Sequence, residues 1–182
     1  MSLPPKKIEI LEMLLMHNEP VRSKQLAEEM NNSFPEIQMH LIGLMKKGYA
    51  ISPEKAYYAI SEAGKEALGL PTIDTQKAKT ILDGTPQSKS FHFYLELNKP
   101  LNAYAATLNE FEDEVTKVNV HSLEFHNKRG DFAVWFDNIG DSELTKKMEL
   151  LQKMNIFGET LRSKLHEIVE MRRSYLVKLL AQ

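Results

Sequence analysis

The feature that most constrains this fold is a change of hydrophobic period at Gly48. Before Gly48, apolar residues recur every three or four positions in three successive segments, which predicts three amphipathic helices. The expected buried stripes are Ile8, Leu11 and Leu15 in the first, Leu26, Ala27 and Met30 in the second, and Ile37, Leu41, Leu44 and Met45 in the third. After Gly48 the apolar residues alternate over 49–51 and 57–60, which predicts two short strands joined as a hairpin by residues 52–56.

Start and stop signals delimit these helices. Ser23 is placed to cap the second helix. Ser33 and Glu36 have the spacing of a capping box ahead of the third helix, which is expected to end at Gly48. Ser61 is expected to cap a last short helix over 62–68.

Helix, helix, helix, hairpin and helix, in that order, are typical of a winged helix-turn-helix. Two strings support this reading, Met45-Lys-Lys-Gly-Tyr-Ala-Ile-Ser and Tyr58-Ala-Ile-Ser-Glu-Ala-Gly-Lys-Glu-Ala-Leu68. The first is similar to the end of a recognition helix entering a wing, and the second to a wing exit with its following helix. Through them, residues 8–68 resemble the winged-helix domains of bacterial and archaeal transcriptional regulators. The resemblance implies DNA binding, although winged helices also serve as protein-interaction modules.

The composition of residues 71–88 predicts a connector, which separates the winged helix-turn-helix domain expected over residues 1–70 from a mainly helical domain over 89–182. The connector contains Pro71, Gly84 and Pro86, and a short helix fits within 75–82. Residues 90–97 alternate like a strand but are also compatible with a helix start. Further helices are expected over 103–118, 119–126, 132–139, 142–154 and 157–181, with Asp131 and Asp141 as caps of the third and fourth.

Four strings in the second domain point to a known family: Phe91-His-Phe, Leu123–His126, Gly130-Asp-Phe132 with Trp135, and Gly140-Asp-Ser-Glu-Leu144. On these residues the second half resembles an archaeal helical domain family of unassigned function. The resemblance implies a separate domain and an archaeal-type source, and it supplies no chemistry. The expected fold class is mainly α with a small β-wing, an N-terminal winged helix-turn-helix followed by a helical domain that ends in a long helix.

Charge restricts how the first domain could hold double-stranded DNA. The chain has a net charge of −2, and residues 1–70 hold eight Lys and Arg against nine Asp and Glu. Phosphate contacts must therefore come from a few local cations. The candidate DNA-binding residues are Arg22, Lys24, Gln38, Met39, His40, Lys46, Lys47 and Lys55. The acidic balance and the outward Met39 favour an alternative, a non-enzymatic protein-interaction module.

The last helix carries the strongest signal for a partner. Its seam residues, spaced by four and three as in a coiled coil, are Leu161, Leu165, Ile168, Arg172, Tyr175 and Leu179. This spacing predicts a homodimer. Packing of the same face within its own domain explains it equally well, and both interpretations stay open.

Catalytic and metal signatures are absent from the sequence. The chain has no cysteine, no glycine-rich phosphate loop and no H-E-x-x-H string. His121 and His126 are five residues apart, so they do not share a helix face as metal ligands would. We therefore expect no enzyme, metal or cofactor, and a soluble cytoplasmic protein without a membrane span. A third hypothesis, a small-molecule-binding second domain, requires a deep polar pocket near His126 and Trp135.

Overall fold

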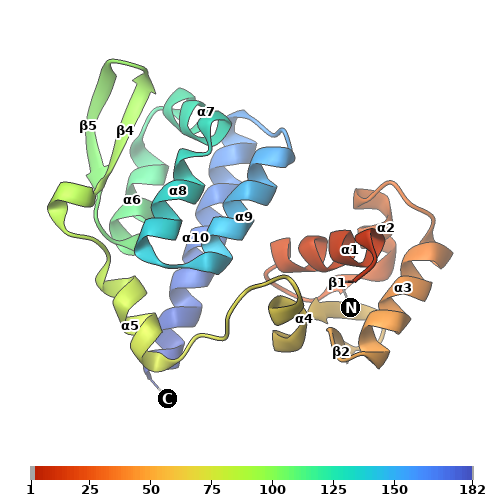
Figure 1. The fold of residues 1–182 in the computed structure, drawn as a ribbon. Coiled ribbons are helices and arrows are strands. Elements are labelled where there is room, and N and C mark those ends of the chain that lie inside the picture. The colour runs from red at the N-terminus through yellow and green to blue at the C-terminus, as the bar shows by residue number, and fades with distance from the viewer. Residues whose placement is uncertain (1–2, 182) are drawn as a thin grey trace. The chain divides into compact units, whose positions relative to one another are not determined.

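The computed structural model describes residues 3–181, which divide into two compact units (Figure 1). One unit ends at Thr72 and the other begins at Ile73. Both are mainly helical, each contains a small antiparallel sheet, and the second ends in a long helix.

The first unit contains α1 (Pro5–Met16), β1 (Val21–Arg22), α2 (Ser23–Glu29), α3 (Phe34–Lys46), β2 (Ala50–Glu54), β3 (Tyr57–Ile60) and α4 (Glu62–Ala67). Its sheet has the order β1-β3-β2, with both neighbouring pairs antiparallel. The hairpin β2–β3 is present as predicted and β3 has the predicted bounds, but β2 extends to Glu54, so residues 52–54, expected in the connection, belong to the strand. Strand β1 was not predicted, because two residues are too few to show alternation. Val21 also pairs with Tyr58, which is distant in the sequence, so no local pattern indicates the strand.

One apolar core holds this unit together. Its buried members are Ile10, Leu11, Leu14, Val21, Leu26, Ala27, Ile37, Leu41, Leu44, Ala50 and Tyr58. Full burial of one aliphatic side chain stabilises a fold by about 1.5–3 kcal/mol, so this cluster is the main source of the unit's stability. The expected stripe of the first helix is partly wrong, because Ile10 and Leu14 are buried while Ile8 is only half-buried.

Two of the three predicted serine caps differ in the structure. Arg22 is the N-cap of α2 because the backbone stays extended there as part of β1, and Ser23 is instead the buried first helical residue. Ser33 occupies the N-cap position of α3, but its side chain makes no capping hydrogen bond within the described part of the chain. Ser61 does cap α4, since its hydroxyl accepts a 3.0 Å hydrogen bond from the Gly64 N–H.

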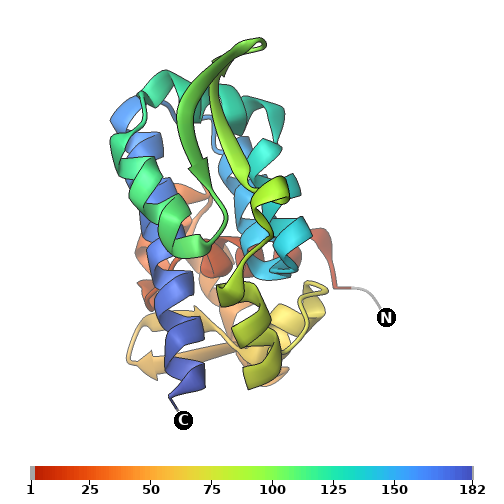
Figure 2. The same cartoon turned by 90° about the vertical axis from the view of Figure 1, so that its left-hand side faces the viewer.

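The second unit contains α5 (Thr75–Asp83), the 3-10 helix η1 (Gln87–Lys89), β4 (Phe91–Glu96), β5 (Lys99–Ala105), α6 (Leu108–Lys117), α7 (Val120–Arg129), α8 (Asp131–Ile139), α9 (Ser142–Lys153) and α10 (Gly158–Leu180). Strands β4 and β5 form an antiparallel hairpin. Figures 1 and 2 show this hairpin along one side of the helices, with its tip extending beyond them. Strand β4 contacts α7, and β5 contacts α6.

The predicted helix over 103–118 begins too early. Residues 103–105 belong to β5, where Ala105 pairs with Phe91, and helix α6 starts only at Leu108 after the side chain of Thr107 caps it. The apolar spacing of this segment fits a helix, but strand pairing with β4 decides its start. Residues 91–96 are correspondingly a strand, which the sequence left open.

A buried ionic cluster joins α9 to α10. The Arg172 side chain is 3% exposed, and its Nε and Nη2 donate to the two carboxylate oxygens of Asp141 at 2.8 and 3.1 Å. Its Nη1 donates to Glu143 at 2.9 Å. Burial lowers the pKa of Arg172, but Asp141 and Glu143 outweigh burial, so that the pKa lies above its ordinary value. Asp141 also caps α9 as predicted, accepting hydrogen bonds from the N–H groups of Glu143 and Leu144.

The predicted dimer seam of α10 packs largely inside its own unit. Leu161, Leu165, Ile168 and Arg172 are buried there. Tyr175 is 37% exposed and Leu179 is half-buried. Helix α10 contacts α5, α6, α7 and α9, so the apolar stripe is used within the unit, and the four buried residues do not form a free surface for a second chain.

Candidate functional site

Helix α3 and the β2–β3 turn carry most of the residues predicted to bind DNA. Lys46 and Lys47 are exposed at the C-terminal end of α3, and Lys55 is exposed at the turn. Lys24 is exposed in the first turn of α2. In the described part of the chain, none of these four lysines pairs with a carboxylate.

The remaining predicted DNA-binding residues are more constrained. Arg22 is exposed, but its Nε donates to the Tyr57 hydroxyl at 2.7 Å and its guanidinium lies over that ring. The Gln38 amide donates to the Tyr58 hydroxyl at 2.8 Å, and both Gln38 and His40 are half-buried. These contacts hold Arg22 and Gln38 against the sheet.

The outer face of α3 is more apolar than the sequence predicted. Met39 is 62% exposed, and Phe34, Ile42 and Met45 are also exposed. Phe34, Met39 and Ile42 line a shallow groove that reaches Lys46. The sequence did not indicate that Phe34 and Ile42 lie at the surface, and Met45, expected on the buried stripe of this helix, is exposed instead.

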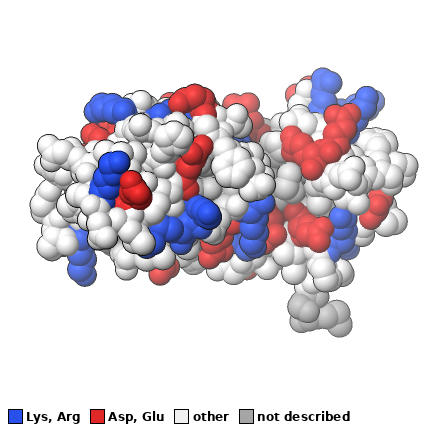
Figure 3. Space-filling view, turned by 90° about the horizontal axis from the view of Figure 1, so that it is seen from above, with Lys and Arg blue, Asp and Glu red and all other residues white. Residues whose placement is uncertain are grey.

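The surface charges are mixed. On the face seen in Figure 3, basic and acidic side chains alternate, and neither sign covers a continuous area. This distribution agrees with the near balance of charged residues in the sequence. Phosphate attraction would therefore rest on a few cations, without the broad positive field of a strongly basic protein.

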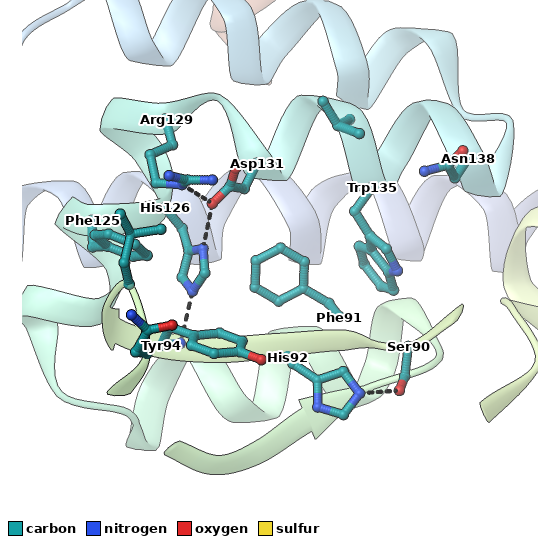
Figure 4. A pocket seen from close by; sticks show the side chains of 13 residues that line it. Ser90, Phe91, His92, Tyr94, Phe125, His126, Arg129, Asp131, Trp135 and Asn138 are labelled. Carbon is teal, nitrogen blue, oxygen red and sulfur yellow. Dashed lines mark hydrogen bonds and ion pairs between the residues drawn. The ribbon is translucent and has the colours of Figure 1, made fainter. Parts of the chain in front are cut away.

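A cavity of about 510 Å³ lies in the second unit, between β4 and helices α7 and α8 (Figure 4). Apolar and aromatic side chains form much of its wall, and polar side chains lie at both of its ends in Figure 4. The lining residues are Ser90, Phe91, His92, Tyr94, Leu97, Asn98, Phe125, His126, Arg129, Asp131, Val134, Trp135 and Asn138. It lies where the small-molecule hypothesis requires a pocket, although it is less polar than that hypothesis expects.

His126 is locked in the wall of this cavity by both ring nitrogens. Its Nε2 accepts a 2.8 Å hydrogen bond from the backbone N–H of Tyr94, so its Nδ1 carries the proton and donates to Asp131 at 2.8 Å. Burial lowers the pKa of His126, and the hydrogen bond to Asp131 only partly opposes this. The neutral imidazole therefore joins β4 to α8 and has no lone pair free for a metal or a proton transfer.

Asp131 has a different role from the predicted one. The N-cap of α8 is Gly130, and the Asp131 side chain makes no capping hydrogen bond in the described structure. Its Oδ2 accepts from His126 and, at 3.0 Å, from the Nε of Arg129. The guanidinium of Arg129 lies over the Phe125 ring, 5.2 Å from its centroid. Arg129 is thereby fixed at the mouth of the cavity, a position that no sequence motif indicated.

The base of the cavity is an aromatic cluster. The Phe91 ring lies 4.8 Å from that of His126 and 5.8 Å from that of Trp135, both edge to face. The indole N–H of Trp135 donates to the carbonyl of Lys89 at 3.2 Å, which fixes the ring. Trp135 belongs both to the buried core and to the cavity wall.

His121 and Glu124 form a separate surface pair. The His121 ring contacts Glu124 at 3.0 Å, and Glu124 also accepts the Gly158 N–H. The Gly158 hydrogen bond, followed by that of His121, lowers the pKa of Glu124. Among residues 3–181, no three His, Asp or Glu side chains gather as a metal site requires.

Comparisons of this chain with protein families, with curated proteins and with solved structures give no match. No helix within residues 3–181 combines the length and apolar character needed to cross a bilayer.

Proposed function

We propose that the protein is a DNA-binding transcriptional regulator whose first unit is a winged helix. The observation that carries this proposal is the element order α1-β1-α2-α3-β2-β3-α4 with the sheet order β1-β3-β2. In a winged helix-turn-helix, the element corresponding to α3 enters the major groove, and the hairpin corresponding to β2–β3 lies against the adjacent backbone.

The free cations of this unit support the proposal. Lys46 and Lys47 extend from the end of α3, Lys55 lies at the hairpin turn and Lys24 at the start of α2. Lysines without a carboxylate partner are available to phosphate oxygens. Since few cations contribute, we expect modest affinity with a clear dependence on salt.

The test is fluorescence anisotropy of the full chain with labelled duplex DNA, beginning with the DNA upstream of its own gene, at several salt concentrations. The variant Lys46→Glu, Lys47→Glu should weaken binding strongly at every salt concentration. Where its binding is still measurable at low salt, the loss of two phosphate contacts should reduce the magnitude of the slope of log K against log salt by about 2. No binding by the unmodified protein even at low salt would contradict the proposal.

The matched control is Lys79→Glu, Lys178→Glu, which changes the net charge equally in the second unit. Both lysines are exposed, and neither forms an ion pair with the residues described. This variant should bind DNA nearly as well as the unmodified protein. Equal loss in both variants would mean that net charge, and not the α3 surface, governs binding.

A second candidate function, protein contact through α3, is favoured by the exposed apolar side chains Met39 and Ile42. Exposed apolar patches commonly mark interaction surfaces. Light scattering over a range of concentrations, on the unmodified chain and on Met39→Ser, Ile42→Ser, tests one form of it. Self-association that the double variant removes, together with absent DNA binding, would favour protein contact.

A further inference from the structure

We propose that the cavity beside His126 binds a small zwitterion, an α-amino acid with an apolar side chain. The amino acid would place its carboxylate on Arg129 and its ammonium group on Asp131, with its side chain over the apolar wall (Figure 4). This inference concerns the second unit alone, so it does not depend on DNA binding by the first.

Opposite charges at the mouth of the cavity select for a zwitterion. Arg129 and Asp131 share one hydrogen bond, from Nε to Oδ2. In the described structure, the terminal nitrogens of Arg129 and the Oδ1 of Asp131 make no hydrogen bond, so donors and an acceptor are free side by side. A simple carboxylate would lie beside Asp131 and a simple amine beside Arg129, where like charges repel.

The two charged groups are held in place before any ligand arrives. Asp131 is fixed by His126, which is itself fixed by the backbone N–H of Tyr94. Arg129 is fixed by Asp131 and by the Phe125 ring. Side chains that are already ordered lose little entropy on binding, which favours affinity for a small ligand.

The apolar part of the cavity wall suits an apolar side chain, beside a polar part formed by Ser90, His92, Asn98 and Asn138. Val134 is 64% exposed and Leu97 is 65% exposed, although both are apolar and line the cavity. Phe91 and Trp135 form the base behind them. A volume of about 510 Å³ is within the range of small-molecule sites, and covering Val134 and Leu97 would remove apolar surface from water.

Trp135 provides a direct assay, because it is the single tryptophan of the chain. Its emission is followed while the full chain is titrated with the apolar L-amino acids, L-leucine and L-phenylalanine first. At least one should change the emission saturably. Analogues that lack one of the two charges should bind at least about tenfold more weakly than the amino acid itself. For L-phenylalanine these are 3-phenylpropionate, which lacks the ammonium group, and 2-phenylethylamine, which lacks the carboxylate.

Two results of the titration would overturn the proposal. One is the absence of any saturable change with any apolar amino acid up to about 10 mM, a concentration that detects even weak sites. The other is equal binding of an analogue that lacks one charge or of the neutral amide 3-phenylpropionamide, since the site would then not recognise a zwitterion.

Variants connect the signal to the named residues. Arg129→Met and Asp131→Asn should each weaken binding about 10- to 100-fold, the usual loss when one partner of a charge-assisted hydrogen bond is removed. Asparagine retains an oxygen that can accept from His126, so the fold is preserved. The matched control is Lys128→Met, one residue away on α7 and outside the cavity lining.

Val134→Glu tests the apolar wall without disturbing the core, because Val134 is mostly exposed. It should abolish binding while circular dichroism and the thermal midpoint stay unchanged. Unchanged affinity in Arg129→Met or in Val134→Glu would place any observed binding elsewhere and refute the proposed site.

Discussion

Removing Arg172 should destabilise the second unit strongly, because it would leave a buried negative charge without its partner. In Arg172→Met the methionine fills much of the same space. The Asp141 carboxylate, 0% exposed, would keep only the backbone N–H groups of Glu143 and Leu144 as partners. Its hydrogen bonds at 2.8 and 3.1 Å to the guanidinium would be lost.

Breaking a buried ion pair by removing one partner costs about 3–5 kcal/mol. We expect the lower end, about 3 kcal/mol, because two backbone donors continue to stabilise the carboxylate of Asp141. Glu143, also released by the change, keeps Lys147 at 3.2 Å. With a denaturant slope of about 1.5 kcal/mol per molar urea, the midpoint should fall by about 2 M.

The assay is urea unfolding of the full chain, followed by the fluorescence of Trp135. Because this is the single tryptophan and it belongs to the second unit, the signal reports unfolding of that unit. The double variant Arg172→Met, Asp141→Ser keeps a capping oxygen but removes the buried charge. It should recover at least half of the lost free energy of unfolding.

A loss below about 1 kcal/mol in Arg172→Met, or no recovery in the double variant, would refute this reasoning. A fall in molecular mass on light scattering, with unchanged unfolding, would instead restore the interpretation of Arg172 as a dimer-seam residue.

Two further predictions concern the second and first units in turn. The pKa of His126 is lower in the folded protein than in the unfolded chain, so the unfolded chain binds the proton more readily. The free energy of unfolding should therefore be highest above the unfolded pKa near 6.5, and should fall as the pH drops through that value towards the folded pKa. His126→Gln should flatten this pH dependence of the urea midpoint. Gly64→Ala should destabilise the first unit, because a Cβ there would lie 2.1 Å from the Tyr49 carbonyl oxygen. Gly43→Ala in α3 should stabilise the unit by about 0.5–1 kcal/mol, because the new Cβ would meet only the flexible end of the Lys7 side chain, with Nζ at 3.1 Å. Circular dichroism melting compares the two variants, and equal effects would contradict the steric argument.

Asp131 and Asp141 show where the sequence ceases to be informative. Each follows a glycine and precedes a segment of helical periodicity, so the sequence predicts both as caps. Asp141 caps its helix, whereas Asp131 pairs with His126 and Arg129. The local signals are the same, and only the surrounding side chains distinguish them.

The apolar stripe predicted for α10 was likewise open to two interpretations, dimerisation and packing within its own domain. Spacing by three and four indicates that Leu161, Leu165 and Ile168 are buried, but it does not say against what. In the structure they pack within the unit. The reverse holds for Ile42, whose apolar side chain remains exposed because no element of the first unit covers it.

The sequence by itself determined the presence and order of most helices, the presence of the β2–β3 hairpin and the division into two parts, because these depend mainly on neighbours within a few residues. Glycines and caps act through local hydrogen bonds and φ angles. Only the tertiary structure decided that residues 103–105 pair with β4, that Arg172 lies inside the unit, and that Arg129 and Asp131 meet at a cavity. These features depend on which distant segments pack together, and hydrophobic spacing alone does not select the partner.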